Sequence, residues 1–307
     1  MSPSPASVDV EVEGRQLKLS NFDKVLYPEA GFTKGAVIDY YTRIAPALLP
    51  HLRQRALTLK RYPNGIDGQF FYEKNCPKHR PPWVETLAVW SARNKADVNY
   101  CLIDELAGLV WVANLASLEL HTSLAYASDV QQPSMVVFDL DPGPPATVVE
   151  CGLVALWLGE ALDAMGLRSF PKTSGSKGLQ LYVPLNTPVT YNETKPFAHA
   201  LARRLEQDHP GEVLSVMKKE LRTGKVFIDW SQNDDSKTTI CVYSLRARPR
   251  PTVSTPVTWE EVERTVDCGD PDSLVFEAPD VLDRVAADGD LFAPLCELEQ
   301  SLPSSLP

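Results

Sequence analysis

The pattern of apolar and polar positions predicts a chain in which helices and strands are mixed. Residues 33–52 begin with a threonine, a favoured helix N-cap, and their apolar side chains recur at helical spacing as far as Pro50. Residues 55–62 alternate as a strand does and lead into a Pro-Asn-Gly turn. Two more helical patterns cover residues 147–165 and 193–208. We therefore expect a mixed α/β (α+β) fold with central sheets flanked by helices.

Three of the predicted strands carry charged or glycine-rich ends. Residues 134–140 (SMVVFDL) have the pattern of a buried strand that holds an aspartate. Residues 172–185 (KTSGSKGLQLYVPL) combine a Gly-Ser turn with a strand, and residues 225–230 (KVFIDW) form a short strand with an aspartate near its end. These segments would bring charged groups to one sheet.

Composition then limits the classes of protein to which this chain can belong. The 307 residues are 44% hydrophobic and 23% charged, with no apolar run long enough to cross a membrane and no secretion signal. The formal charge of −10 argues at first against nucleic acid, but 13 acids and two arginines fall in residues 251–307, so the first 250 residues are nearly neutral. Six cysteines without CxxC spacing predict reduced thiols in a cytoplasmic protein.

No internal repeat or low-complexity linker divides the chain. We therefore expect one catalytic domain over residues 15–295, acidic from about residue 251, between flexible tails at 1–14 and 296–307.

Two acids two positions apart suggest a metal site. Asp139 and Asp141 project from one face if the strand continues through Leu140. Two carboxylates on one face repel, and a divalent cation such as Mg²⁺ or Mn²⁺ would relieve the repulsion. A solvated strand end explains the pair equally well. Asp229 interrupts an otherwise buried strand and is a candidate third ligand, although a core aspartate that accepts backbone N–H bonds is the alternative.

Candidate phosphate-binding groups are present as well. Residues 173–178 (TSGSKG) can form an anion-binding turn, but they do not match the Walker A pattern, and a plain hairpin turn is the commoner structure for such a segment. Basic residues gather around Asp229 and elsewhere, and positioned cations supply much of the catalysis in phosphoryl transfer. The Phe70-Phe71-Tyr72 run is either an aromatic platform for bases or part of a core.

Eight segments in this order resemble one family, the polymerase domain of bacterial ligase D within the archaeo-eukaryotic primase superfamily. The resemblance covers about residues 17–250. Its segments are LSNFDKVLYP (19–28), LKRYPNGIDGQFFYEK (59–74), PPWV (81–84), LASLELH (115–121), VVFDLDPG (136–143), KTSGSKGLQLYVPL (172–185), LRTGKVFIDWSQN (221–233) and SKTTICVYSLRARPRPTVSTPVTW (236–259).

The resemblance implies roles for residues at the matching positions. It implies that Asp139, Asp141 and Asp229 are the catalytic acids and bind two divalent ions, Mn²⁺ or Mg²⁺. The implied nucleotide-binding residues are Lys60, Phe71, Tyr72, His121, Ser174, Lys177, Gln180, Arg222, Gln232 and Arg246. The implied pocket for the 5′-phosphate of a downstream DNA strand consists of Asn21, Lys24 and Lys34.

The chain departs from the family pattern at a nucleotide-binding position and in its domain composition. Gln180 stands where family members usually have His, and an amide forms hydrogen bonds but carries no charge. His121 is kept, although a lone His on what we expect to be a packed helix is usually structural. The chain also leaves no room for the ligase and nuclease domains of ligase D, so we expect a stand-alone relative.

The resemblance thus implies an archaeo-eukaryotic primase-type polymerase fold and a metal-dependent nucleotidyltransferase. The resemblance implies primer extension and gap filling in DNA repair, with ribonucleotides preferred. Its expected partners are gapped or primer-template DNA, NTP or dNTP, and separate ligase and end-binding repair proteins. We expect a monomer without membrane contact, located in a bacterial cytoplasm near the nucleoid. A two-metal nuclease or phosphoesterase, and a catalytically weakened binder of DNA gaps and ends, are the alternatives.

Overall fold

The computed structural model describes residues 7–92 and 94–303, and the chain forms two compact units. Unit 1 contains the described residues up to 123 together with 240–253 and 277–290. Unit 2 contains residues 124–239, 254–276 and the described residues from 291 onward. The single catalytic domain expected over residues 15–295 stays a prediction, and the chain returns to unit 1 twice within it.

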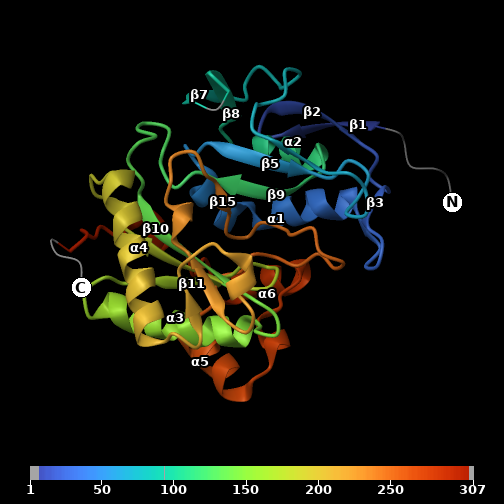
Figure 1. Cartoon of the computed structure of the whole chain (residues 1–307). Coiled ribbons are helices and arrows are strands. Elements are labelled where there is room, and N and C mark those ends of the chain that lie inside the picture. The colour runs from blue at the N-terminus through green and yellow to red at the C-terminus, as the bar shows by residue number, and fades with distance from the viewer. Residues whose placement is uncertain (1–6, 93, 304–307) are drawn as a thin grey trace. The chain divides into compact units, whose positions relative to one another are not determined.

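The main sheet of unit 1 has the strand order β15-β9-β5-β8-β7 among the described residues, and β6 also pairs with β5. Its strands are β5 (Leu57–Arg61), β6 (Phe71–Glu73), β7 (Thr86–Ser91), β8 (Ala96–Cys101), β9 (Ser117–Thr122) and β15 (Thr239–Ile240). Two small hairpins add β1 (Ser7–Val12) with β2 (Arg15–Ser20), and β3 (Val25–Tyr27) with β4 (Phe32–Thr33). The helices are α1 (Lys34–Leu52), α2 (Leu106–Asn114) and α6 (Ala278–Asp288), shown in Figure 1.

Helix α1 forms where the sequence predicts it. Thr33 is the N-cap, and its hydroxyl accepts a hydrogen bond from the backbone N–H of Ala36 at 3.2 Å. The helix continues two residues past Pro50 to Leu52. Its packing against α2 buries the apolar side.

Strand β9 corrects one expectation, because His121 lies on a strand and not on a packed helix. Leu118 and Leu120 point to the core and are fully buried, so Glu119 and His121 share the opposite face. The segment SLELHT alternates with the period of a strand, and this period decides its structure.

Unit 2 is built on a sheet with the order β11-β12-β10-β14-β13. The strands are β10 (Met135–Pro142), β11 (Phe170–Thr173), β12 (Leu179–Pro184), β13 (Val213–Leu214) and β14 (Val226–Asp229). The helices are α3 (Val148–Asp163), α4 (Tyr191–Asp208), α5 (Trp259–Cys268) and α7 (Pro294–Glu297), with 3-10 turns η1 (Lys219–Leu221), η2 (Trp230–Gln232) and η3 (Pro271–Leu274). Figure 1 shows α3 and α4 running along this sheet.

The two faces of the unit 2 sheet differ in chemistry. Val136, Phe138 and Leu140 of β10 pack into one apolar core with side chains from α3 and α4. Because side chains alternate along a strand, Asp139 and Asp141 lie on the opposite face. The helices therefore bury the apolar side of β10 and leave its acids on the other side.

Both predicted tails are partly structured. Ser7–Val12 forms β1, paired in register with β2, so this part of the expected tail at 1–14 is a strand; residues 1–6 lie outside the described residues. In the expected tail at 296–307, Gln300 donates to the carbonyl of Pro184 at 2.7 Å and its backbone N–H donates to Leu185. Residues 304–307 lie outside the described residues. Strand pairing holds the first segment, and hydrogen bonds from Gln300 to the end of β12 and the residue after it hold the second; charge and composition reveal neither.

The expectation of reduced thiols is wrong for one pair. Cys76 and Cys101 form a disulfide with their Cα atoms 5.0 Å apart. The backbone N–H of Cys76 donates to the carbonyl of Asn99, so the loop before Cys76 lies along β8. This pairing depends on a contact across 25 positions, which the spacing of cysteines in the sequence does not show.

The acidic stretch is part of the folded units. Helix α5 belongs to unit 2 and packs against α3, whereas α6 belongs to unit 1 and packs against α1. None of the helices in the described residues is long and apolar enough to span a membrane.

Candidate active site

Three predicted acids lie on two neighbouring strands of unit 2. Asp139 of β10 lies directly opposite Asp229 of β14, and Asp141 follows two positions along β10. Strand β10 continues through Leu140 to Pro142, so Asp139 and Asp141 share a face as the spacing predicts. The structure therefore brings the three carboxylates to one face of one sheet.

The carboxylates repel one another. Burial and then the charge of Asp141 raise the pKa of Asp139, with a smaller contribution from Asp229. Burial also raises the pKa of Asp141, and Asp229 adds to the effect while the guanidinium of Arg222 opposes it. Two of the three acids are thus held in a site that disfavours their negative charge.

These acids fit a divalent cation by their chemistry. Each supplies hard carboxylate oxygens, and a cation would offset both the burial and the repulsion that raise the pKa of Asp139 and Asp141. In the described part of the chain, no three His, Cys, Asp or Glu side chains already converge as metal ligands. Asp229 is turned to protein donors instead, since its Oδ1 accepts from Ser231 N at 3.0 Å and its Oδ2 from Gln232 Nε2 at 2.9 Å. Binding an ion would exchange some of these bonds for bonds to the metal.

The glycine-rich turn after β11 packs closely on the acid-bearing strand. A Cβ at Gly178 would overlap the carbonyl oxygen of Leu140, so only glycine allows this approach. Ser174 Oγ accepts hydrogen bonds from the backbone N–H groups of Ser176 and Gly178, both at 3.2 Å. Lys177 at the tip of the turn is exposed. The predicted residues Ser174 and Lys177 thus lie in a turn beside β10, where the hydroxyl of Ser174 holds the turn together.

Arg222 supplies a cation beside the acids. Its guanidinium stacks 4.0 Å from the ring centre of Phe227 and lies 3.7 Å from Asp141 Oδ2. Its Nε is buried and has no hydrogen-bond partner among the described residues. A Cβ at Gly143 would overlap the carbonyl oxygen of Arg222, which explains the glycine that follows Pro142. An arginine with an unmet donor next to paired carboxylates is suited to a phosphate ligand.

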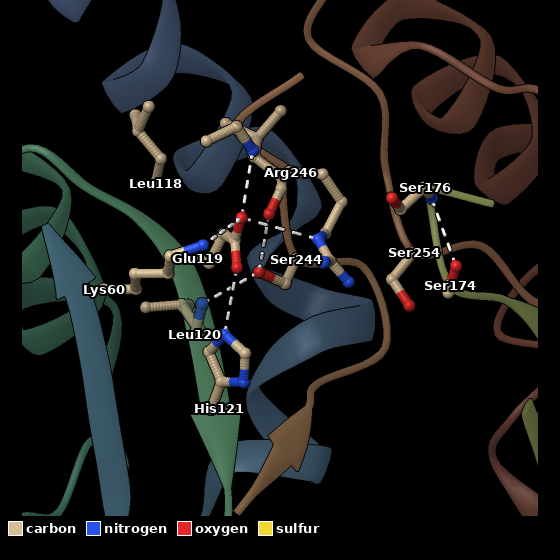
Figure 2. A network of polar contacts seen from close by, with 12 residues as sticks. Lys60, Leu118, Glu119, Leu120, His121, Ser174, Ser176, Ser244, Arg246 and Ser254 are labelled. Carbon is tan, nitrogen blue, oxygen red and sulfur yellow. Dashed lines mark hydrogen bonds and ion pairs between the residues drawn. The ribbon is translucent and has the colours of Figure 1, made fainter. Parts of the chain in front are cut away.

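Lys60, His121 and Arg246, which are also predicted to bind nucleotide, lie in unit 1 around one buried carboxylate (Figure 2), whereas Gln180 lies on β12 of unit 2. Glu119 accepts hydrogen bonds from Lys60 Nζ at 3.2 Å, from His121 Nε2 at 3.1 Å and from the backbone N–H of Ala247 at 3.2 Å. Arg246 Nε lies 3.6 Å from the same carboxylate. Lys60 lies directly opposite Glu119 in the pairing of β5 with β9.

Glu119 is a residue that the sequence analysis missed. Burial alone would raise its pKa, but the hydrogen bond from His121 and the charges of Arg246 and Lys60 lower the pKa to about 2. Burial lowers the pKa of His121, an effect that Glu119 opposes. The sequence did offer one signal for Glu119: it lies two residues before His121, so on a strand the two side chains share a face. Glu119 therefore fixes the three basic side chains that the sequence did identify.

The two rings of the predicted aromatic pair lie on different faces of one strand. Phe71 and Tyr72 are adjacent on β6, so their side chains point to opposite faces. Tyr72 lies 6.0 Å from the ring of His121, whereas Phe71 lies 5.1 Å from the guanidinium of Arg61. Both rings are exposed. Tyr72 thus belongs with the Glu119 cluster, and Phe71 does not.

The predicted 5′-phosphate residues lie together near the start of α1. Lys34 Nζ donates to the carbonyl of Ser20 at 2.7 Å, and its backbone N–H donates to the carbonyl of Lys24. Lys24 Nζ donates to Asn64 Oδ1 at 3.1 Å, and its backbone N–H donates to Asn21. Burial, then Lys24 and Arg61, lower the pKa of Lys34 to about 8. Cations that repel one another in this way favour an anionic ligand.

Known proteins resemble this chain in sequence. A family model described as LigD, primase-polymerase domain, matches residues 33–292. The multifunctional non-homologous end joining DNA repair protein LigD of Mycobacterium tuberculosis is 43% identical over 285 residues, which are 90% of this chain and 36% of that protein. The bifunctional non-homologous end joining protein LigD of Bacillus subtilis is 30% identical over 275 residues, which are 89% of this chain and 43% of that protein.

A solved structure confirms the fold. The polymerase domain from Mycobacterium tuberculosis ligase D, in complex with DNA, matches with a TM-score of 0.85 and 40% identity over 92% of this chain and 99% of that one. The chain spans 36% of the length of the full mycobacterial relative. The predicted mixed α/β fold and the predicted family resemblance are thus confirmed, and the chain belongs to the LigD primase-polymerase domain family.

Proposed function

We propose that this chain is a metal-dependent, template-directed nucleotidyltransferase that extends primer 3′ ends and fills short gaps during DNA repair. The observation that carries the proposal is the set of Asp139, Asp141 and Asp229 on one sheet face, with Arg222 beside them. Acids that repel one another and an arginine with an unmet donor fit a site for divalent ions and phosphates.

The mechanism assigns the acids to metal binding. Asp139, Asp141 and Asp229 would hold two divalent ions, Mn²⁺ or Mg²⁺, which lower the pKa of a primer 3′-hydroxyl and neutralise charge on a triphosphate. Arg222 and the turn with Ser174 and Lys177 would bind phosphate oxygens, and Gln232 would orient Asp229 through its hydrogen bond.

In unit 1 we assign Lys60, His121, Arg246 and Tyr72 to nucleotide binding, and keep Phe71 in that set as an exposed ring next to Arg61. Glu119 holds Lys60, His121 and Arg246 in place, because each of them is within 3.6 Å of its carboxylate. Cations oriented by a buried carboxylate lose less conformational entropy when a ligand binds.

We further propose that Asn21, Lys24 and Lys34 bind the 5′-phosphate of a downstream strand. Burial and then the charge of Lys24 lower the pKa of Lys34, and a bound phosphate would offset both effects, which supports this assignment. Preference for ribonucleotides and for Mn²⁺ is part of the same proposal and rests on the family resemblance.

The names of the relatives point to a pathway. These relatives are named for non-homologous end joining, and we propose that this chain serves in end joining as well, together with ligase activity and end-binding proteins. We also propose that it acts as a monomer near bacterial DNA.

A gapped-duplex assay tests the proposal. The DNA carries or lacks a 5′-phosphate at the gap, and labelled NTP or dNTP is supplied with Mn²⁺ or Mg²⁺. We expect incorporation with release of pyrophosphate, lost in Asp139→Ala and kept in Asp163→Ala, which removes an exposed acid at the end of α3. Release of nucleotides from the DNA without use of triphosphate would indicate a nuclease. Binding to the gap without any metal-dependent reaction would indicate a binding protein.

A further inference from the structure

Four polar side chains form one row across the unit 2 sheet. Lys172 of β11 lies directly opposite Gln180 of β12, and Gln180 lies directly opposite Asp139 of β10. Asp139 in turn lies opposite Asp229 of β14. Residues that are paired across adjacent strands share a face, so the row runs from an ammonium through an amide to two carboxylates.

Lys172 is completely buried. Its Nζ donates to Gln180 Oε1 at 2.6 Å and to Ser254 Oγ at 2.5 Å, and it lies 5.3 Å from the ring centre of Tyr182. A buried ammonium is costly unless a negative charge compensates it. Asp139 interacts electrostatically with Lys172, with Gln180 between them in the row.

The ammonium fixes the orientation of the amide. A lysine ammonium has three donors and no acceptor, so Gln180 must present its oxygen to Lys172. Its Nε2 is then the group left to face β10, and Asp139 accepts a hydrogen bond from the Gln180 side chain. Gln180 is only 3% exposed, so water does not compete for either end of the amide.

We propose that Lys172 is a positioning residue for the metal-binding acids and that it acts through Gln180. The amide holds one side of the Asp139 carboxylate, so that the other side stays available to a cation, and the buried ammonium offsets part of the repulsion among the acids. This inference rests on the proposed metal-binding function of Asp139. It gives Gln180 a role in the protein itself, whether or not the side chain also contacts a nucleotide.

Metal binding without DNA or nucleotide tests the inference. Free Mn²⁺ is measured by electron paramagnetic resonance during titration of the wild-type chain, Lys172→Met, Gln180→Leu and the double variant. Loss of a partner that orients a metal ligand typically weakens metal binding by about tenfold or more. We expect each single variant to show a loss of about that size, and the double variant to be no worse than the weaker single one, because both act through one chain of contacts.

Ser254→Ala is the matched control, since it removes a different hydrogen-bond partner of Lys172 and leaves the amide in place. We expect Mn²⁺ binding within about twofold of wild type. Gln180→His provides a variant that keeps a hydrogen-bonding group in the row, and it should recover part of the binding that Gln180→Leu loses. If Lys172→Met does not fold, as judged by circular dichroism, the two Gln180 variants decide the question.

Kinetics separate positioning from a general loss of structure. In the incorporation assay, Lys172→Met and Gln180→Leu should lower kcat while the KM for nucleotide changes less than about threefold. Mn²⁺ affinity equal to wild type in both variants, or losses that add fully in the double variant, would overturn the inference. A wild-type chain that binds Mn²⁺ but incorporates no nucleotide would contradict the proposed function alone, because the effect of the variants on Mn²⁺ binding can still be measured.

Discussion

The two units each hold buried or half-buried carboxylates, but in opposite electrostatic settings. Glu119 in unit 1 is surrounded by Lys60, His121 and Arg246, and its pKa falls to about 2. Burial, and then the charges of neighbouring carboxylates, raise the pKa values of Asp139 and Asp141 in unit 2. A carboxylate that protein cations already satisfy is suited to hold side chains in place, whereas carboxylates that repel one another are suited to bind a cation from solution.

Removal of a repelling acid should have the largest effect on catalysis. Asp139→Ala eliminates a metal ligand whose contribution is several kcal/mol, so primer extension should fall by about a thousandfold or more. The free energy of unfolding should not fall, since the substitution relieves repulsion with Asp141 and Asp229. Primer-extension rates and urea unfolding, measured on the same preparation, check the predicted loss of activity and the predicted retention of stability. Full extension activity in this variant would refute the assignment of the acids.

Substitution of Glu119, whose charge protein cations already balance, should instead lower the free energy of unfolding. Glu119→Gln leaves three basic groups without their buried counter-charge, and the loss of one partner from a buried ion pair typically costs about 3 kcal/mol. Urea unfolding should show this loss, and Glu29→Gln, at an exposed position in unit 1, should not. Equal stability of the two variants would mean that Glu119 does not organise its neighbours.

Low pH should protonate Glu119 and remove its stabilising ion pairs, which provides a second test of the difference between the two units. The folded-state pKa of Glu119, about 2, lies below its usual value of 4.5, so the stabilisation is present above pH 4.5 and is lost as the pH falls toward 2. Between pH 6 and pH 3 this group should account for a loss of about 2 kcal/mol in the free energy of unfolding. The difference between wild type and Glu119→Gln across that range measures it. A difference that stays constant with pH would contradict the assignment.

The smallest expected effect concerns a third electrostatic setting, the repelling cations Lys24 and Lys34. Because burial, Lys24 and Arg61 lower the pKa of Lys34 to about 8, its positive charge is lost as the pH rises from 7 to 9. The preference for DNA with a 5′-phosphate should therefore shrink by up to about tenfold over that range. Lys34→Arg remains charged throughout and serves as the control. Binding titrations with matched DNA, with and without the phosphate, give the result, and a preference independent of pH in the wild-type chain would exclude this role for Lys34.

The pattern of apolar and polar residues over a few positions was sufficient to predict these helices and strands and to place Asp139 and Asp229 on strands. The alternation around Asp139 and the buried run before Asp229 predict strands, and both acids lie on strands of one sheet. The threonine before α1 predicts the start of that helix correctly. These features depend on neighbours within a few positions, which is the range over which hydrophobic periodicity and capping act.

Register across strands was the part that the sequence did not reveal. Glu119 acquires its role from Lys60 on β5, and Lys172 acquires its place from the pairing of β11 with β12. The disulfide between Cys76 and Cys101 likewise depends on a contact between distant segments. Phe71 and Tyr72 are an exception, because alternation along a strand is a local rule and is sufficient to place these neighbours on opposite faces of β6.

The central claim is that the repelling acids of unit 2, and not the satisfied acid of unit 1, bind the divalent ion. The direct measurement is the thermal unfolding midpoint at increasing Mn²⁺ for wild type, Glu119→Gln and the double variant Asp139→Asn with Asp141→Asn. A ligand that binds the folded state raises the midpoint. The account predicts that Mn²⁺ raises the midpoint of wild type and of Glu119→Gln by similar amounts and leaves that of the double variant unchanged. An equal rise in the double variant, or no rise in Glu119→Gln, would contradict it.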